Sequence, residues 1–299
     1  MPQPTVSVVI ASGIRGEFLF RCLDSLRSQA KSQSAEVIVV DRCGDEVMVR
    51  LSRDYPFVTA IPAELNHRPS IPELRQIGAR KAGGDIVSVI EKYCIAPPDW
   101  LETIRSSFRE GDIAIGGPML PGNSPRLCDW VVYFCEYHNY LPPWVDGDRD
   151  LLAGSNIAYR REALMRHVDV LGEGYWDVVL HPALRKEGTF HSVPAMGSYH
   201  TGPFDYGYYL KQRYLLSRSW AGTERKRISP GKWLVYLVVA PILPFVFLTR
   251  IAQRVFKSRC HIGRFLEAIP LLIPVLIAYV WGEWLGYLFG PGNAMEFVE

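Results

Sequence analysis

The sequence lacks net charge, paired cysteines and the motifs of several common enzyme classes. Its 299 residues hold 33 Lys and Arg against 31 Asp and Glu, a formal charge of +2. The six cysteines form no CxxC pair, and none lies at zinc-finger spacing from a histidine, which excludes a zinc finger. With 48% hydrophobic and 21% charged residues, the composition excludes a disordered chain, a collagen and a coiled coil. Charges spread through the first two thirds also exclude a protein with many membrane spans.

Several catalytic and targeting signatures are missing too. The chain has no GxSxG nucleophile elbow, no Walker loop and no GxGxxG, since residues 12–17 read SGIRGE. These absences give no support to a serine hydrolase, a P-loop protein or a dinucleotide-binding protein. The first residues, MPQPTVSVVIAS, have no basic segment before a long apolar one, so we expect no signal peptide. Scattered cysteines without such a signal are typical of a reducing compartment, which predicts a cytoplasmic globular part.

The small net charge hides two segments of opposite sign. Residues 211–264 carry twelve Lys and Arg and a single acidic residue, Glu224, for a net charge of +11. The rest of the chain carries 21 basic and 30 acidic residues, a net charge of −9. We expect the basic segment to face anionic lipid headgroups and the diphosphate of a ligand, and we expect no nucleic acid partner.

Two apolar stretches, at residues 233–249 and 268–289, occupy the last part of the chain. Their uncharged parts, residues 233–249 and 268–282, are 17 and 15 residues long, which is short for straight membrane spans of roughly 20 residues. They are either two buried core helices or a membrane-associated helical region over 223–299, and edge aromatics with flanking Arg and Lys favour the second. Basic clusters on both sides of the first stretch predict a re-entrant or interfacial hairpin bent at Pro241 and Pro244, whereas the second stretch either re-enters or crosses.

The first 120 residues alternate short apolar runs with helical patterns, which predicts an α/β fold with a mostly parallel sheet. Helices are expected at residues 16–31, 70–82 and 99–109. Residues 121–150 are rich in Pro, Trp and Tyr without a clear period, and we expect a long loop that forms a wall or lid. The expected strands are Val6–Ile10, Glu36–Asp41, Phe57–Ile61, Asp85–Ile90 and Ile113–Gly116.

Ligands of such sheets bind at the carboxyl ends of the strands, so the residues after each strand are candidates. Asp41 either accepts a hydrogen bond from a ribose or base, or caps a turn. Arg75, Arg80 and Lys81 either face a diphosphate or are solvated helix charges. The candidates after the strands are Ala11 and Ser12, Asp41, and Glu91-Lys92-Tyr93.

A series of motifs over residues 5–220 resembles the family 2 inverting glycosyltransferases. In order they read VSVVIAS, EVIVVD, ELRQIGARKAGGDIVSVIEKYCIAPPDWLE, LLAGSNIAYRREAL and YWDVVLHPALRKEG. The resemblance implies a GT-A fold that uses nucleotide-diphosphate sugars, with a catalytic domain over 1–222. It also implies that Asp41 contacts the nucleotide base. Arg75 falls where the family has the arginine of its ARN-like helix, and Gln76 replaces the asparagine.

The DxD motif of that family, which holds the donor through a divalent cation, falls on Glu91-Lys92-Tyr93. The resemblance implies a metal site in which Glu91 and His200, the histidine of SYHTG, hold Mg or Mn. The substitutions leave a second possibility open. Positive charge must stabilise the leaving diphosphate, and Lys92, Arg213 or Arg218 can supply it without metal. Arg213 and Arg218 lie in a segment similar to the QxxRW element of polysaccharide synthases. The alternative interpretation of this segment is a basic amphipathic helix that lies on anionic lipid.

The catalytic base of the family falls on Asp177, with Trp176 in place of the preceding acid. Transfer in one step with inversion needs a carboxylate that takes the proton from the acceptor hydroxyl. Asp177 alternatively caps the helix that it precedes. Gly154-Ser155-Asn156 matches the loop where acceptor and donor sugar meet.

The resemblance therefore predicts a glycosyltransferase with a cytoplasmic catalytic domain at a membrane. Its acceptor would be lipid-linked or a glycan, in polysaccharide or glycolipid assembly. The alternative is a catalytically altered nucleotide-sugar-binding or scaffold protein of a membrane assembly complex. A nucleotidyltransferase is disfavoured, because no glycine-rich triphosphate loop follows the first strand.

Overall fold

The chain forms two compact units. One comprises Met1–Gly122 and Pro142–Gly202, and the other comprises Asn123–Leu141 and Pro203–Glu299. By packing, residues 203–222 belong with the C-terminal helices. The expected end of the catalytic domain at residue 222 stays a prediction. The computed structural model describes residues 5–13, 16–122, 126–173, 179–202 and 205–298.

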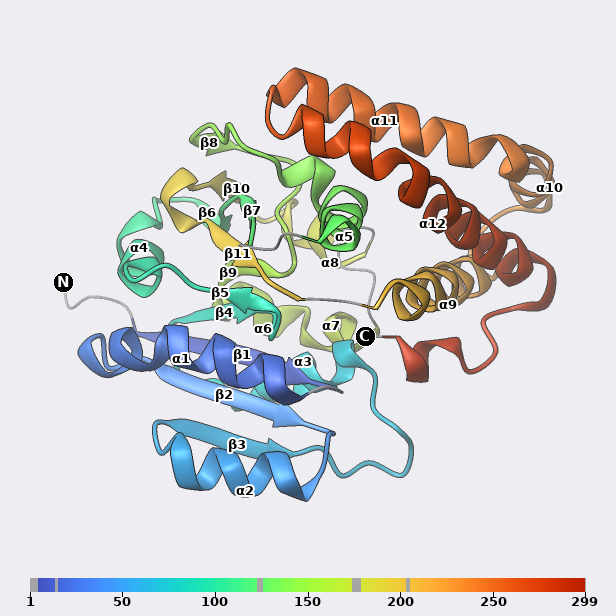
Figure 1. Ribbon diagram of the computed structural model, residues 1–299. Coiled ribbons are helices and arrows are strands. Elements are labelled where there is room, and N and C mark those ends of the chain that lie inside the picture. The colour runs from blue at the N-terminus through green and yellow to red at the C-terminus, as the bar shows by residue number, and fades with distance from the viewer. Residues whose placement is uncertain (1–4, 14–15, 123–125, 174–178, 203–204, 299) are drawn as a thin grey trace. The chain divides into compact units, whose positions relative to one another are not determined.

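The first unit is built on an eight-stranded sheet in the order β3-β2-β1-β4-β9-β6-β10-β8 (Figure 1). β1 pairs in parallel with β2 and β4, whereas β9 is antiparallel to both β4 and β6. β1 is buried along its whole length, as expected of a central strand covered on both faces. The predicted α/β class with a mostly parallel sheet is confirmed. The strands are β1 (Val6–Ser12), β2 (Glu36–Asp41), β3 (Val58–Pro62), β4 (Ile86–Ile90), β6 (Asp112–Gly116), β8 (Gly147–Asp148), β9 (Asn156–Arg160) and β10 (Thr189–Ser192).

Helices and a small second sheet complete this unit. In α3, Gly78 lies against Val9 of β1 so closely that a Cβ atom there would clash with the valine side chain. This close approach brings α3 down onto the strands that lead to the candidate site. The helices are α1 (Gly16–Ser32), α2 (Asp45–Asp54), α3 (Ile71–Lys81), α4 (Trp100–Ser107), α6 (Arg161–Arg166), α7 (Val168–Glu173), α8 (Leu180–Leu184) and η2 (Pro194–Met196). The small sheet has the order β5-β11-β7, with β5 (Cys94–Ile95), β7 (Met119–Pro121) and β11 (Ser198–His200).

The prediction of a continuous loop over residues 121–150 is wrong. The helix α5 (Leu127–Tyr137) forms within it, followed by the 3-10 turn η1 (His138–Tyr140). The sequence LCDWVVYFCEY is apolar nearly all round, so it shows no alternation between a buried and an exposed face. Val131, Val132 and Phe134 are all buried. Tertiary packing therefore stabilises a helix that the sequence pattern did not predict.

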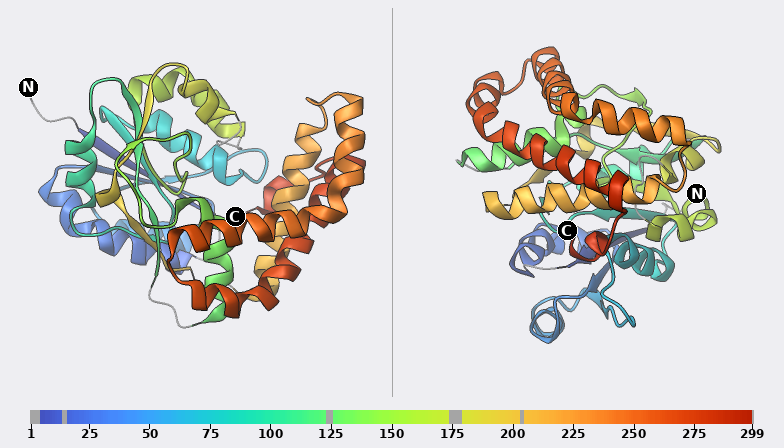
Figure 2. Two further views of the ribbon diagram at one scale, coloured as in Figure 1. Left: turned by 90° about the horizontal axis from the view of Figure 1, so that it is seen from above. Right: turned by 90° about the vertical axis from the view of Figure 1, so that its right-hand side faces the viewer.

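The second unit is helical. A bend separates α10 from α11 at η3, and Figure 2 shows the two helices running in different directions. Of the two predicted hinge prolines, Pro241 lies in η3 and Pro244 lies in the first turn of α11. The chain reverses later, at residues 259–261, where Arg259 and His261 have positive φ angles of 55° and 58°. The first apolar stretch therefore bends but does not turn back on itself. The remaining elements are α9 (Tyr206–Glu224), α10 (Pro230–Val239), η3 (Ala240–Ile242), α11 (Leu243–Ser258), α12 (Ile262–Phe289) and η4 (Ala294–Phe297).

Among the described residues, two helical segments are long and apolar enough to cross a membrane, Pro230–Ser258 and Ile262–Phe289. In the most apolar 18 residues of each segment, only 11% of the first segment and 39% of the second are buried. Val238 and Phe245 are 69% and 72% exposed. Such apolar exposure does not suit the core helices of a water-soluble protein.

Candidate functional site

The carboxyl ends of β1 and β2 place Ser12 directly beside Asp41 in the sheet register. Asp41 is 2% exposed, and its Oδ2 accepts hydrogen bonds from the backbone N–H groups of Cys43 at 2.8 Å and Gly44 at 3.1 Å. Its Oδ1 is buried and has no hydrogen-bond partner among the residues that the structure describes. One oxygen thus caps the turn, while the other is a strong acceptor that none of the described residues uses.

Cys43 links this acid to the candidate cation Lys92. Its Sγ lies 3.4 Å from Ser12 Oγ. Burial raises the pKa of the Cys43 thiol to about 11, Asp41 adds to that rise, and the hydrogen bond with Ser12 and the charge of Lys92 oppose it. Because β1 pairs in parallel with both β2 and β4, the carboxyl ends of these three strands lie at the same edge of the sheet. The sequence analysis missed Cys43, although its place two residues after Asp41 was a usable signal.

The segment after β4 brings Glu91 to Arg75, a contact that the sequence did not predict. Arg75 Nη2 donates to Glu91 Oε1 at 2.8 Å, and the arginine side chain is only 8% exposed. The start of α3 is fixed by a capping box between Ser70 and Glu73, which sets the rotation that turns Arg75 inward. The backbone N–H of Glu91 also donates to the carbonyl of Ser155, at 3.1 Å.

Lys92, Tyr93 and His200 lie in the buried part of the same region. Lys92 is 3% exposed, with its Nζ 5.1 Å from the centre of the Tyr93 ring. The Tyr93 and His200 rings lie 6.3 Å apart, and the Tyr93 carbonyl accepts from the backbone N–H of Thr201 at 2.8 Å. The small sheet therefore carries His200 beside the segment that replaces DxD.

The described residues do not fit a resident divalent cation. Across the described part of the chain, no group of three or more His, Cys, Asp or Glu side chains converges to hold a metal. At the predicted position, the carboxylate of Glu91 is engaged by Arg75, and the next residue is the cation Lys92. A divalent ion prefers several anionic oxygen ligands, whereas the predicted set offers the carboxylate of Glu91, which is paired with Arg75, and the ring of His200.

The Gly154-Ser155-Asn156 segment leads into β9. Asn156 is fully buried, with Nδ2 donating to Met196 O at 2.6 Å and Oδ1 accepting from Trp100 Nε1 at 2.9 Å. Ser155 Oγ lies 3.5 Å from Met119 Sδ. The asparagine amide thus joins β9 to α4 and η2, which supports a positioning role, and its predicted role near the sugars stays a prediction.

The predicted base Asp177 and its neighbour Trp176 lie outside the described residues. Beyond them, α8 is fixed to the sheet by His181, whose Nε2 lies 2.9 Å from the hydroxyl of Tyr159 in β9. Both side chains are buried. The sequence analysis did not single out this pair.

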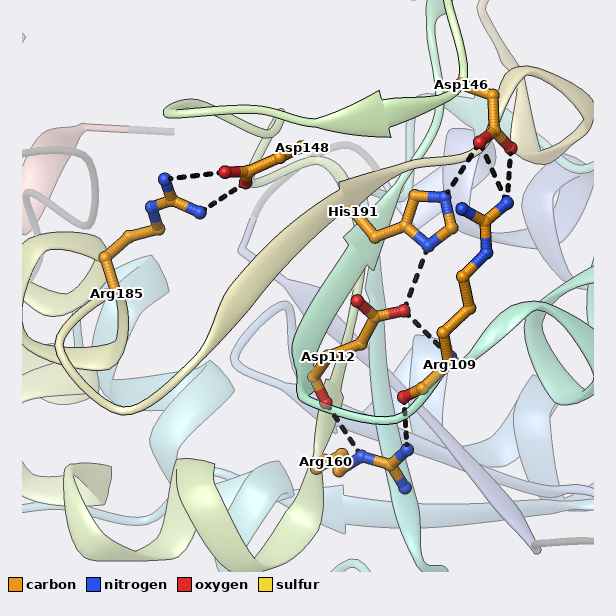
Figure 3. A network of polar contacts seen from close by, with 7 residues as sticks. All are labelled: Arg109, Asp112, Asp146, Asp148, Arg160, Arg185 and His191. Atoms are coloured by element: carbon orange, nitrogen blue, oxygen red, sulfur yellow. Dashed lines mark hydrogen bonds and ion pairs between the residues drawn. The ribbon is translucent and has the colours of Figure 1, made fainter.

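A network of ion pairs holds the edge of the sheet next to β8 (Figure 3). His191 contacts Asp112 through Nδ1 at 2.9 Å and Asp146 through Nε2 at 3.3 Å, and Arg109 also binds Asp146 at 2.8 Å. The hydrogen bond from Arg109 helps to hold the pKa of Asp146 below its usual range. The last part of the predicted wall or lid is thus bound to the sheet at Asp146.

The two candidate diphosphate residues lie on α9 of the second unit. Arg213 is buried and pairs with Glu136 at 2.9 Å, and Tyr209 also donates to that carboxylate at 2.9 Å. Arg218 donates to the hydroxyl of Tyr214 at 3.0 Å, and its buried Nε has no hydrogen-bond partner among the described residues. The buried Nε of Arg213 also has no partner among these residues, so the pairing with Glu136 is what distinguishes the two arginines.

At the level of sequence, the chain matches a family model and a curated relative. A family model described as "Glycosyl transferase family 2" matches residues 7–168. A glucosyl-dolichyl phosphate glucuronosyltransferase of Haloferax volcanii is 27% identical over 176 residues. The alignment covers 54% of each chain, so the protein spans about half the length of this curated relative.

Solved structures show the same fold at low sequence identity. A mannosyltransferase from Pyrobaculum calidifontis in complex with GDP-Man and Mn2+ has a TM-score of 0.56 at 15% identity, covering 96% of this chain and 88% of its own. TarS from S. aureus in complex with UDP-GlcNAc has a TM-score of 0.52 at 14% identity, covering 93% of this chain and 90% of its own. The predicted GT-A type of fold is confirmed. Because the family model spans more than half of the sequence, the chain belongs to glycosyl transferase family 2.

Proposed function

We propose that this protein transfers a sugar, with inversion, from a nucleotide-diphosphate sugar to a lipid-linked acceptor at a membrane. The observation that carries the proposal is the buried Oδ1 of Asp41, at the strand ends of a family 2 chain. This oxygen has no hydrogen-bond partner among the described residues. Uracil and guanine each present an N–H group that can donate to such an oxygen. The similar structures contain GDP-Man and UDP-GlcNAc, which carry these two bases.

In the proposed reaction, Asp177 takes the proton from an acceptor hydroxyl. The hydroxyl oxygen bonds to the anomeric carbon from the face opposite the diphosphate. The bond between that carbon and the diphosphate oxygen breaks, and the nucleoside diphosphate leaves with the electron pair. Inversion follows from this single displacement.

The leaving diphosphate needs positive charge, and we assign it to Lys92 and Arg75. Lys92 is almost fully buried, so its charge is weakly screened by water. Glu91 holds the guanidinium of Arg75 in place through the 2.8 Å contact. Arg218 is proposed as a further diphosphate contact, whereas Arg213 stabilises the second unit through Glu136.

The acceptor and membrane parts of the proposal have separate support. The Haloferax volcanii relative is, by its name, a glucosyl-dolichyl phosphate glucuronosyltransferase, and a sugar hydroxyl on such a carrier suits a carboxylate base. The exposed apolar side chains of α10 to α12 support a membrane-associated unit. The basic residues of 211–264 favour the anionic, cytoplasmic face of that membrane for the catalytic unit.

The test is the Asp177→Asn variant. We expect transfer to fall by at least about a hundredfold, because general-base assistance supplies 10²–10⁴ in rate, while nucleotide affinity stays unchanged. Asp169→Asn is the matched control, since that exposed acid on α7 pairs only with Arg80 in the contacts seen at its side chain. Full transfer in Asp177→Asn would refute the assignment of the base.

A further inference from the structure

The second unit contains an apolar cavity between the bent segment α10-η3-α11 and α12. Its volume is about 400 Å³, and all eleven residues that line it are apolar. Ala240, Pro241 and Pro244 form one wall at the bend, and Trp281 and Trp284 of α12 form part of the other. The bend at η3 separates the helices there, which creates space that straight packed helices would fill.

The cavity opens on a surface that is itself apolar. Phe245, Ile277 and Trp281 line the cavity, yet they are 72%, 53% and 53% exposed. A ligand entering from this side crosses an apolar surface. The volume lies within the range of pockets that enclose a small ligand.

Polarity rises in one direction along the helices from this cavity. One helical turn beyond Trp284, the carbonyl of Tyr287 accepts from Trp233 Nε1 at 2.9 Å, and the Tyr287 and Tyr236 rings lie 5.2 Å apart. Two cations lie over these aromatic rings: Arg225 at 5.8 Å from the Trp233 ring and Lys232 at 5.5 Å from the Tyr236 ring. The order is apolar, then aromatic, then cationic, which matches an anionic lipid inserted tail first.

We propose that this groove binds the polyisoprenoid phosphate that carries the acceptor sugar. The hydrocarbon chain lies in the cavity at Pro241 and Trp281, and the phosphate lies at Arg225 and Lys232. A carrier with one chain and one phosphate matches one cavity with one cationic end, whereas a phospholipid has two chains to accommodate. The proposal rests on the lipid-linked acceptor of the proposed function and assigns the site for its carrier.

The direct test is photo-crosslinking of the full chain in phosphatidylcholine vesicles that contain a polyisoprenyl phosphate with a diazirine on its chain. We expect labelled peptides from η3 and α12, with labelling competed by unlabelled polyisoprenyl phosphate. Ala240→Phe, which fills the cavity, should lower labelling at least about tenfold, since it displaces roughly two or more buried methylene groups. Val238→Phe adds similar bulk on the exposed face of α10 and should label like the wild type.

Further variants keep the test decisive if Ala240→Phe fails to fold. Ile273→Trp narrows the cavity from its partly exposed α12 side, and Arg225→Gln with Lys232→Gln removes the cationic end. Both should lower labelling several-fold. The proposal is overturned if the well-folded variants label like the wild type, or if phosphatidylglycerol competes as well as polyisoprenyl phosphate.

The outcome is separable from that of the proposed function. Crosslinking needs no sugar donor, so it can succeed in a chain that transfers nothing. Where transfer is observed, Ala240→Phe should raise KM for the polyisoprenoid-linked acceptor about tenfold and leave KM unchanged for the same saccharide on a short water-soluble aglycone. An equal rise for both acceptors would contradict a site for the lipid chain.

Discussion

Replacing Asp41 by Asn tests the nucleotide site at a single atom. In the wild type, Asp41 Oδ2 accepts the turn hydrogen bonds from Cys43 and Gly44 at 2.8 and 3.1 Å. The amide oxygen of the variant can still accept both of them. The amide nitrogen then occupies the position of the unpartnered Oδ1. A charged acceptor becomes a neutral donor that faces the N–H group of the base, while the turn itself is retained.

The size of the effect follows from the hydrogen bond that is lost. A hydrogen bond to a charged group contributes about 1.5–3 kcal/mol, which corresponds to roughly 10- to 150-fold in Kd. Asp41 is almost completely buried, so water does not replace the lost contact. We therefore expect UDP or GDP, whichever the wild type prefers, to bind Asp41→Asn at least about tenfold more weakly.

Isothermal titration calorimetry with the free nucleoside diphosphates measures this loss without any acceptor. Asp45→Asn is the matched control, because it removes one negative charge from an exposed position at the start of α2. Its nucleotide affinity should match that of the wild type. A Kd for Asp41→Asn within twofold of the wild-type value, in a variant of unchanged circular dichroism, would refute the assignment of Asp41 to the base.

Three further predictions concern metal, packing and pH. EDTA should leave the Kd for the nucleoside diphosphate unchanged within twofold, because Arg75 engages the carboxylate of Glu91; a tenfold loss restored by Mn2+ would contradict the poor fit of a cation. Asn156→Ala should lower the free energy of unfolding in urea by roughly 1–3 kcal/mol for each buried group left unpaired, Trp100 Nε1 among them; an unchanged midpoint would contradict the positioning role. The folded-state pKa of Asp146 is depressed, with the Arg109 hydrogen bond as the largest cause. The stability that it contributes is present above its unfolded pKa of about 4 and is lost as pH falls through the folded value. Asp146→Asn should therefore flatten the fall in stability between pH 5 and pH 2, and an unchanged slope would speak against this linkage.

The sequence was most informative where local pattern and burial agree. The β-branched runs at Val6–Ile10 and Glu36–Asp41 predicted strands, and both form buried strands with a neighbouring strand on each side. Because parallel strands end at the same edge, the residues after them converge without further information, which is why Asp41 and Lys92 act on one thiol. The resemblance singled out Arg75 and Glu91 separately, and their contact was found only in the fold.

Partners that are distant in sequence were not predictable. Glu136 lies on α5, a helix whose mostly apolar sequence lacks the periodicity by which helices are predicted. Nothing in the sequence therefore pairs Glu136 with Arg213. Asn156 joins Trp100 and Met196 through three separate segments, a contact that exists only after the chain has folded. The bend near Pro241 and Pro244 was predicted from these two prolines, but the cavity beside it also depends on the packing of α12.

The central claim is transfer from a nucleotide-diphosphate sugar to a lipid acceptor, and product analysis tests it most directly. The full chain, in vesicles with a lipid-linked saccharide, is supplied with a panel of sugar-labelled nucleotide donors. The account predicts that one donor moves its label into the lipid phase, releases one nucleoside diphosphate for each sugar transferred, and gives a product with inverted anomeric configuration by NMR. Nucleotide binding at Asp41 without transfer from any donor would instead indicate a nucleotide-sugar-binding or scaffold protein, and a product with retained configuration would contradict the single displacement.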